Sequence, residues 1–349
     1  MQHTIVNDKL VPMQPHAPYA GPMSNVERNP DVAVLEPGEP CSDVEVLTPR
    51  DVPLGGPRAM PVARTLPQRK RSLVGSWCFL DHYGPDDVSV TGGMSVPRHP
   101  HTGLATVSWL FSGEIDHLDS GGNAARVVPG ELNLMIAGRG ITHQEISTDQ
   151  TRILHGVQLW YALPDATRFS ENHFAHYVPE PVSPAPGVSA RVFIGSLAGS
   201  ASPVDTRTPD LLGAELTLEA GASVTLEARR DFEYAVLAES GDARVNGTAI
   251  AHRELAYVPT GSDSLTIAVE DAARVILLGG VPFAEQIVMW WNFVGRTHDE
   301  VAEFRRRYQA EMGFEPGESP DPLFGDFPSG QPDALPAPVL PNVRLRPRE

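Results

Sequence analysis

The chain has 349 residues, enough for two domains that each bury a core of their own, with further segments at both ends. Its 27 lysines and arginines against 44 aspartates and glutamates give a net charge of −17, so the surface repels nucleic-acid phosphates and anionic membranes. Hydrophobic residues make up 41% of a chain that is rich in glycine and proline, which is typical of an all-β globular protein. Neither a signal peptide nor an apolar run of about 20 residues is present, so we expect a cytoplasmic protein.

The first segments of the chain are of two kinds. Residues 1–58 are rich in proline, glycine and acidic residues, which indicates a flexible amino-terminal arm with one candidate strand at Val44–Leu47. Residues 63–71 are locally basic because they contain Arg64, Arg69, Lys70 and Arg71. A solvated edge strand or turn is the simpler interpretation of this basic segment, and a patch for an anionic partner is the alternative.

Alternating patterns then predict a series of strands. Asp81 and His82 end an apolar run, and we interpret them as structural or gating residues. Between positions 105 and 111 the odd residues are apolar and the even ones mostly polar, the pattern of a half-buried strand. Turn signals at 119–123 and 129–131 separate the strands that follow. Antiparallel strands joined in this way can close into a small barrel.

Two pairs of metal-competent side chains flank these strands. His99 and His101 are two residues apart, and so are His143 and Glu145. Residues i and i+2 of a strand point to the same face, so a barrel can bring both pairs together in its interior. Three imidazoles and one carboxylate suit a single Fe(II), Mn, Ni, Cu or Zn ion, among which the ligands do not choose. With neutral histidines such a site stays cationic and attracts an anionic enolate or phenolate.

Other polar residues lie close to these pairs in the sequence. His117 and His155 are interpreted first as structural histidines with satisfied hydrogen bonds, and second as residues that support a metal ligand from behind. Gln158 is a candidate polar contact to a substrate, whereas Trp160 is expected to pack in the barrel.

The second half of the chain predicts a second barrel without a metal. Residues 179–186 are rich in proline and indicate a stiff connector, where we place the boundary between the domains. Residues 234–241 weakly repeat the pattern of 107–113. The metal-competent pairs do not repeat, and His252 alone cannot replace them.

One helix is predicted near the carboxy terminus. Thr297 and Glu300 fit a capping box, and an apolar face follows, made of Val301, Phe304, Tyr308 and Met312. This helix should pack back across the barrels, with Trp290 and Trp291 as anchors. The proline-rich residues 314–349 are expected to form an extended tail.

Several motifs closely resemble those of the pirin family, within the cupin superfamily. They are His99–Gly103, Glu114–Ser120, Pro129–Glu131, Ala137–Glu145 and His155–Trp160. The resemblance covers about residues 60–313 and implies an all-β bicupin: two tandem cupin barrels of the double-stranded β-helix, or jelly-roll, type with a short carboxy-terminal helix. It implies a metal-binding barrel at 59–178, and a metal-free barrel with the packing helix at 187–313, between the arm of residues 1–58 and the tail of residues 314–349.

The resemblance also implies a function. In the family one metal ion, for which Fe(II) is the first candidate, is held by three His and one Glu, here His99, His101, His143 and Glu145. Some members are similar to quercetin 2,3-dioxygenases, which implies O2 and a small aromatic or enolisable substrate. A vertebrate member acts as an iron-dependent transcriptional cofactor, which implies, as the alternative, a regulatory protein that binds a protein partner. Ala105 stands where the family often has Glu or Gln, which leaves Glu145 as the obvious carboxylate base.

Overall fold

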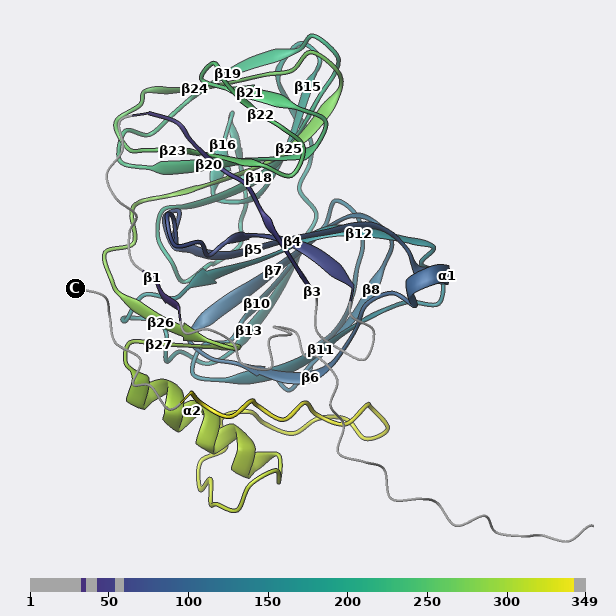
Figure 1. Cartoon of the computed structure of the whole chain (residues 1–349), viewed down its shortest axis with the longest axis vertical. Coiled ribbons are helices and arrows are strands. Elements are labelled where there is room, and N and C mark those ends of the chain that lie inside the picture. The colour runs from purple at the N-terminus through teal and green to yellow at the C-terminus, as the bar shows by residue number, and fades with distance from the viewer. Residues whose placement is uncertain (1–32, 36–42, 54–59, 342–349) are drawn as a thin grey trace, which may run out of the picture.

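The computed structural model describes residues 33–35, 43–53 and 60–341. Almost all regular structure in these residues is β-strand, and it forms two barrels that lie one above the other (Figure 1). The predicted all-β fold with two tandem barrels and a short carboxy-terminal helix is confirmed. No helix in this part of the chain has the length and hydropathy that a membrane span requires.

The first barrel consists of two antiparallel sheets. The larger sheet has, in order, β13 (His173–Tyr177), β10 (Leu132–Ile136), β7 (Leu104–Ser112), β12 (Ile153–Ala162), β5 (Trp77–Asp87), β4 (Pro61–Leu66) and β3 (Arg50–Pro53). The smaller sheet has β6 (Ser95–His101), β11 (Ile141–Ser147), β8 (Ile115–Asp119) and β9 (Ala124–Val127). The predicted metal-competent pairs thus lie on the neighbouring strands β6 and β11.

The second barrel repeats this architecture. Its larger sheet has β14 (Val182–Ala185), β15 (Val188–Ile194), β18 (Leu211–Leu218), β25 (Ala273–Gly280), β20 (Glu233–Ser240), β23 (Leu255–Val258) and β2 (Glu45–Leu47). Its smaller sheet has β19 (Ser223–Glu227), β24 (Ser264–Ala268), β21 (Ala243–Val245) and β22 (Thr248–Ile250). The interior between these sheets is an apolar core, which includes Val224, Leu226, Val236 and Leu277.

Shorter elements complete the described chain. They are a sheet of β1 (Ala33–Leu35), β26 (Ile287–Trp290) and β27 (Phe293–Gly295), the hairpin of β16 (Ser196–Leu197) and β17 (Ser200–Ala201), and the helices α1 (Val88–Thr91) and α2 (His298–Glu311).

Strand β7 shows how the two barrels join. The odd residues Ala105, Val107 and Trp109 are buried as predicted, in a core that they share with residues of the second barrel such as Phe193 and Leu237. The even side of β7 is buried as well, because it faces the interior of the first barrel. The alternation therefore separates two buried environments, an apolar interface and a polar interior, and not core from solvent.

The predictions for the amino-terminal segment need correction. Residues 50–53 form β3 of the first barrel, so the predicted flexible arm is wrong there. Residues 45–47 pair with β23 of the second barrel. The strand predicted at Val44–Leu47 is confirmed as β2. Most other residues of the arm lie outside the described part of the chain. The proline-rich connector was expected to be stiff and to contain no strand, whereas Val182–Ala185 form β14 and pair with β15.

The basic segment is not a solvated face throughout. Arg64 is buried and forms two hydrogen bonds to Asp81, at 2.7 and 2.8 Å. Arg71 is buried as well, 3.0 Å from Glu45, with its guanidinium 3.7 Å from the ring centre of Tyr257. Of the four basic residues, Arg69 and Lys70 are the exposed ones.

Helix α2 packs on β26 and β27, and the tail runs along the outer face of the smaller sheet (Figure 1). Thr297 caps the helix as predicted, accepting a hydrogen bond from the Glu300 N–H at 3.1 Å. In the tail, Phe324 is fully buried, and the Phe324 carbonyl accepts a hydrogen bond from the Thr142 hydroxyl. The Leu335 N–H donates to the carbonyl of Arg98 at 2.8 Å. The predicted extended tail therefore packs on β6 and β11, on the face opposite the histidines.

Candidate metal centre

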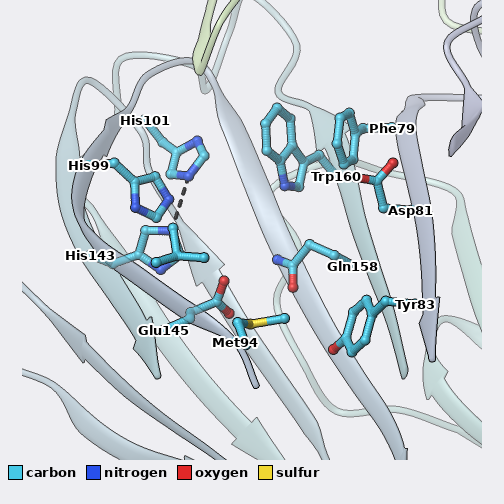
Figure 2. A pocket seen from close by; sticks show the side chains of 11 residues that line it. Phe79, Asp81, Tyr83, Met94, His99, His101, His143, Glu145, Gln158 and Trp160 are labelled. Atoms are coloured by element: carbon cyan, nitrogen blue, oxygen red, sulfur yellow. Dashed lines mark hydrogen bonds between the residues drawn. The ribbon is translucent and has the colours of Figure 1, made fainter. Parts of the chain in front are cut away.

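The strands β6 and β11 bring three histidines together. His99 lies directly opposite His143 in the antiparallel pair, and His101 is on the same face of β6 as His99. His101 Nε2 is 3.0 Å from His143 Nε2, and one ring nitrogen from each of the three lies within 4.8 Å of the others. All three side chains are buried and point into one cavity (Figure 2). The predicted convergence of these histidines is confirmed.

The protonation of these histidines favours metal binding. The Nδ1 of His99 is 2.8 Å from the carbonyl oxygen of Pro97, so it carries the proton and Nε2 keeps a lone pair. Burial lowers the pKa of His99 to about 4. Burial and the neighbouring imidazoles lower the pKa values of His101 and His143 well below the ordinary value. All three side chains are therefore neutral near pH 7, the state in which imidazole binds a metal.

Glu145 lines the same cavity but lies to one side of the three histidines (Figure 2). Its Oε1 accepts a hydrogen bond from the Ser108 hydroxyl at 2.9 Å. A Glu145 oxygen lies within 4.8 Å of His143 and His117, but the carboxylate does not join the group of His99, His101 and His143. Burial raises the pKa of Glu145. To share an ion with all three histidines, its side chain must turn away from Ser108.

The remaining walls of the cavity are largely apolar. They are formed by Phe79, Asp81, Tyr83, Met94, Val96, Gln158 and Trp160. The rings of Phe79 and Trp160 stack at 4.0 Å, and the Trp160 ring lies 5.0 Å from that of His101. The cavity volume is about 20 Å³, which is room for about one water molecule. As it stands, the cavity has room for one ion or one small coordinating group and not for a larger molecule.

Three of the nearby polar residues take clear positions. His117 lies behind His143, and the Nδ1 atoms of the two rings are 3.4 Å apart. The His117 Nε2 is 3.2 Å from the Asp119 carboxylate. This position supports the second interpretation of His117, as a residue that supports a metal ligand from behind. Gln158 lines the cavity, as a substrate contact would. His155 does not belong to this site, because its side chain faces the second barrel.

Sequence reasoning missed one member of the site, Ser108, and gave undue weight to Ala105, which lies outside the site. Ser108 binds Glu145, and its place on the polar side of the alternating β7 was the signal that could have found it. Ala105 is on the opposite side of β7, in the core between the barrels. Because the Ala105 side chain does not face the cavity, a carboxylate missing at this position leaves the polar groups of the site unchanged.

The second barrel has no counterpart of the histidine cluster among its described residues. Arg229 stands near the place in the second barrel that corresponds to His99–His101 in the first. It is ion-paired with Asp210 and Asp231, and Arg230 is paired with Asp263. None of the groups of three potential metal ligands in the described residues lies wholly within this barrel.

Comparisons with known proteins agree with this architecture. Family models described as "Pirin" and "Pirin C-terminal cupin domain" match residues 59–161 and 213–314. The chain is 38% identical to the Pseudomonas aeruginosa protein named "Putative quercetin 2,3-dioxygenase PA1205", over 91% of this chain and 98% of that one. A solved structure of quercetin 2,3-dioxygenase from Acinetobacter baumannii is 34% identical, with a TM-score of 0.79, and the match covers 87% of this chain and 98% of that one.

The fold also matches that of the bacterial pirin YhhW from Escherichia coli, solved in complex with nickel(II). The TM-score is 0.55 and the identity 14%, over 69% of this chain and 100% of that one. The two family models, together with the relative that is 38% identical along nearly the whole chain, agree with the motifs and with the two-barrel architecture. The chain belongs to the pirin family.

Proposed function

We propose that His99, His101, His143 and Glu145 hold one divalent transition-metal ion, with Fe(II) as the first candidate and Ni, Mn, Cu or Zn as alternatives. The buried, neutral imidazoles support this assignment. The Nε2 lone pair of His99 faces a water-poor cavity, and a cation there would also accept the Nε2 lone pairs of His101 and His143. The nitrogen atoms of His101 and His143, 3.0 Å apart, are spaced as two ligands of one ion are.

We further propose that the protein is an oxygen-dependent dioxygenase of flavonol-like, quercetin-type or other enolisable substrates. The observation that carries this proposal is the buried carboxylate of Glu145 beside the histidine cluster. When bound, the metal ion supplies Lewis acidity toward an enolate oxygen and a redox centre for reaction with dioxygen. The names of the relatives from Pseudomonas aeruginosa and Acinetobacter baumannii are consistent with this chemistry.

In this proposal Glu145 is the general base. Burial raises its pKa, so it accepts a proton more readily than an exposed carboxylate does. While Ser108 holds one carboxylate oxygen, as in this structure, the other can take the proton of an enolic hydroxyl, and Glu145 is a ligand of the ion only when it has turned away from Ser108. The apolar walls, including Phe79, Met94 and Trp160, exclude water and strengthen the attraction between the enolate and the cationic site.

The size of the cavity sets a condition on this function. A volume of about 20 Å³ does not accommodate a whole flavonol. Side chains that line the cavity must therefore move when such a substrate binds. Met94, which follows two glycines with positive φ and has a flexible side chain, is the lining residue best suited to this movement.

The test is a single-turnover experiment. Protein loaded with each of the five metals is mixed with quercetin without oxygen, and oxygen is then added. We expect loss of the flavonol absorbance and release of one carbon monoxide per quercetin consumed. Glu145→Gln should lower the rate about 100-fold or more, whereas His176→Gln, on an exposed position of the same barrel, should leave it unchanged. The absence of turnover with all five metals would exclude quercetin as the substrate.

The narrow cavity favours a second candidate, a non-enzymatic regulator that depends on its metal or redox state. In that case the bound ion would change the affinity of a surface of this protein for a transcription factor or a metabolic enzyme. Affinity capture with the metal-loaded protein and with His143→Ala tests this function. A protein partner retained only by the metal-loaded form supports it, and an identical set of partners for both forms argues against it.

A further inference from the structure

A second group of potential metal ligands lies between the two barrels. His82 on β5 and His155 on β12 come from the first barrel, and Glu239 on β20 comes from the second. The His82 and His155 Nε2 atoms are 3.1 Å apart. Glu239 Oε1 is 2.7 Å from His155 Nε2 and 3.7 Å from His82 Nε2. Three ligand atoms thus converge from separate strands.

The ring N–H groups of neutral His82 and His155 cannot form favourable hydrogen bonds at every one of these close contacts. If His82 has its proton on Nδ1, that N–H is buried without a hydrogen-bond partner among the described residues. If His82 instead has its proton on Nε2 and donates it to His155, then His155 Nε2 accepts that hydrogen bond and carries no proton of its own. Its lone pair then faces the Glu239 carboxylate oxygen at 2.7 Å. Neutral histidines therefore leave one unfavourable contact in either arrangement. A cation bound by the two Nε2 atoms and Glu239 Oε1 removes the contact between the lone pair and the carboxylate, whereas the His82 Nδ1–H stays without a partner among the described residues.

The spacing also matches that of the first site. The His82–His155 separation of 3.1 Å is nearly the 3.0 Å separation of His101 and His143. Ligand atoms at about 2.0–2.2 Å from one ion lie roughly 3 to 3.5 Å apart. Of the three separations here, 3.1 Å lies within that range, 2.7 Å lies below it and 3.7 Å lies above it. One ion can therefore reach all three atoms after shifts of a few tenths of an ångström.

The surroundings hold these ligands in place. Arg274 lies 3.4 Å from Glu239 Oε2, which leaves Oε1 for the centre. The Phe111 ring packs 5.0 Å from that of His155. Glu239 and His82 are buried, and the His155 side chain is 13% exposed. Two histidines and one carboxylate leave the fourth position of a tetrahedral ion to a water molecule, and the positive charge of Arg274 makes this site weaker than the first.

We propose that His82, His155 and Glu239 form a second metal site, which takes a divalent cation of the zinc type and fastens the two barrels to each other. Two imidazole nitrogens and one carboxylate oxygen are ligands that Zn²⁺ commonly takes. Because Glu239 comes from the second barrel and both histidines from the first, an ion here bridges the barrels. The site is independent of the metal in the first barrel.

The test uses Zn²⁺ and the metal-stripped, full-length protein. We expect two equivalents of bound zinc in the wild type and one in His101→Ala. Glu239→Gln and the milder His155→Asn should each bind one equivalent, at the first site. Glu270→Gln, an exposed carboxylate in the second barrel, should bind two. Zinc should also raise the Tm of His101→Ala and lose this effect when Glu239→Gln is added.

Anomalous diffraction at the zinc edge gives the decisive measurement without any substitution. A peak between His82, His155 and Glu239 in zinc-loaded wild-type crystals would establish the site. One equivalent of zinc in the wild type, with a single peak at His99, His101 and His143, would overturn the proposal. Unchanged zinc binding in both Glu239→Gln and His155→Asn would overturn it as well.

Discussion

Asp81 and His82 are consecutive residues of β5 whose side chains belong to different sites. Asp81 lines the cavity of the first barrel, where Arg64 binds its carboxylate, whereas His82 lies 3.7 Å from Glu239 of the second barrel. Neighbouring side chains of a strand point to opposite faces, and both faces of this sheet are covered. A single strand therefore contributes to the candidate metal centre and to the group between the barrels.

Removal of one histidine should abolish metal binding at the first site. His101→Ala deletes one of the three converging nitrogens, so we expect the iron or nickel content of protein purified without added metal to fall at least about tenfold. Elemental analysis of the purified variant measures this. His176→Ala is the matched control on the same barrel, and equal metal contents in His101→Ala and the control would show that the cluster does not hold the ion.

The metal-free protein should lose stability in weak acid. The pKa of His99 is about 4 in the folded state and about 6.5 in the unfolded chain. The unfolded chain therefore binds the proton first, and the free energy of unfolding falls as the pH decreases from about 6.5 to 4, by about 3 kcal/mol for this residue. The raised pKa of Glu145 opposes part of this change. Urea unfolding between pH 7 and 4 measures the slope, and His99→Gln should flatten it.

Arg64→Ala should be among the most destabilising single substitutions in the first barrel. It leaves the buried Asp81 carboxylate without the two hydrogen bonds that now neutralise it. Breaking a buried ion pair on one side costs about 3–5 kcal/mol. The cause is tested by chemical denaturation of two proteins, the single variant Arg64→Ala and the double variant Arg64→Met/Asp81→Asn. The double variant should recover most of the loss, and a double variant as unstable as Arg64→Ala would contradict the electrostatic explanation.

Trp109→Phe should weaken the contact between the barrels. The Trp109 Nε1–H donates to Glu215 of the second barrel at 2.8 Å, inside a buried interface. Loss of this donor leaves a buried carboxylate oxygen with a poorer partner, which costs about 1–3 kcal/mol. A double-mutant cycle with Glu215→Gln isolates the interaction. Strictly additive effects of the two substitutions would show that the hydrogen bond contributes nothing.

Gly103→Ala should disturb the strand that holds His99 and His101. Gly103 has a φ of +67°, and a Cβ atom added there would meet the carbonyl oxygen of Val294 at 2.4 Å. The positive φ alone strains an alanine, and the backbone contact with β27 cannot give way cheaply. We expect a Tm lower by several degrees, together with reduced metal content. Gly122→Ala, which also has a positive φ but no contact within 4 Å, separates the two effects.

The sequence alone determined the strands, the turns and the face on which the metal-competent residues lie. The i, i+2 spacing of His99 and His101, and of His143 and Glu145, needs only the geometry of an extended strand. The helix start at Thr297 follows from its capping chemistry in the same way. Such features are local, so a sequence pattern is sufficient to predict them.

Only the tertiary structure decided what covers each face. The pattern of β7 did not reveal that its apolar side meets a second barrel, nor that Ala105 is turned away from the cavity. It did not separate His117, behind His143, from His155, beside Glu239. These outcomes depend on contacts between residues far apart in the chain. Alternation reports that a face is buried, and only the folded chain shows which residues bury it.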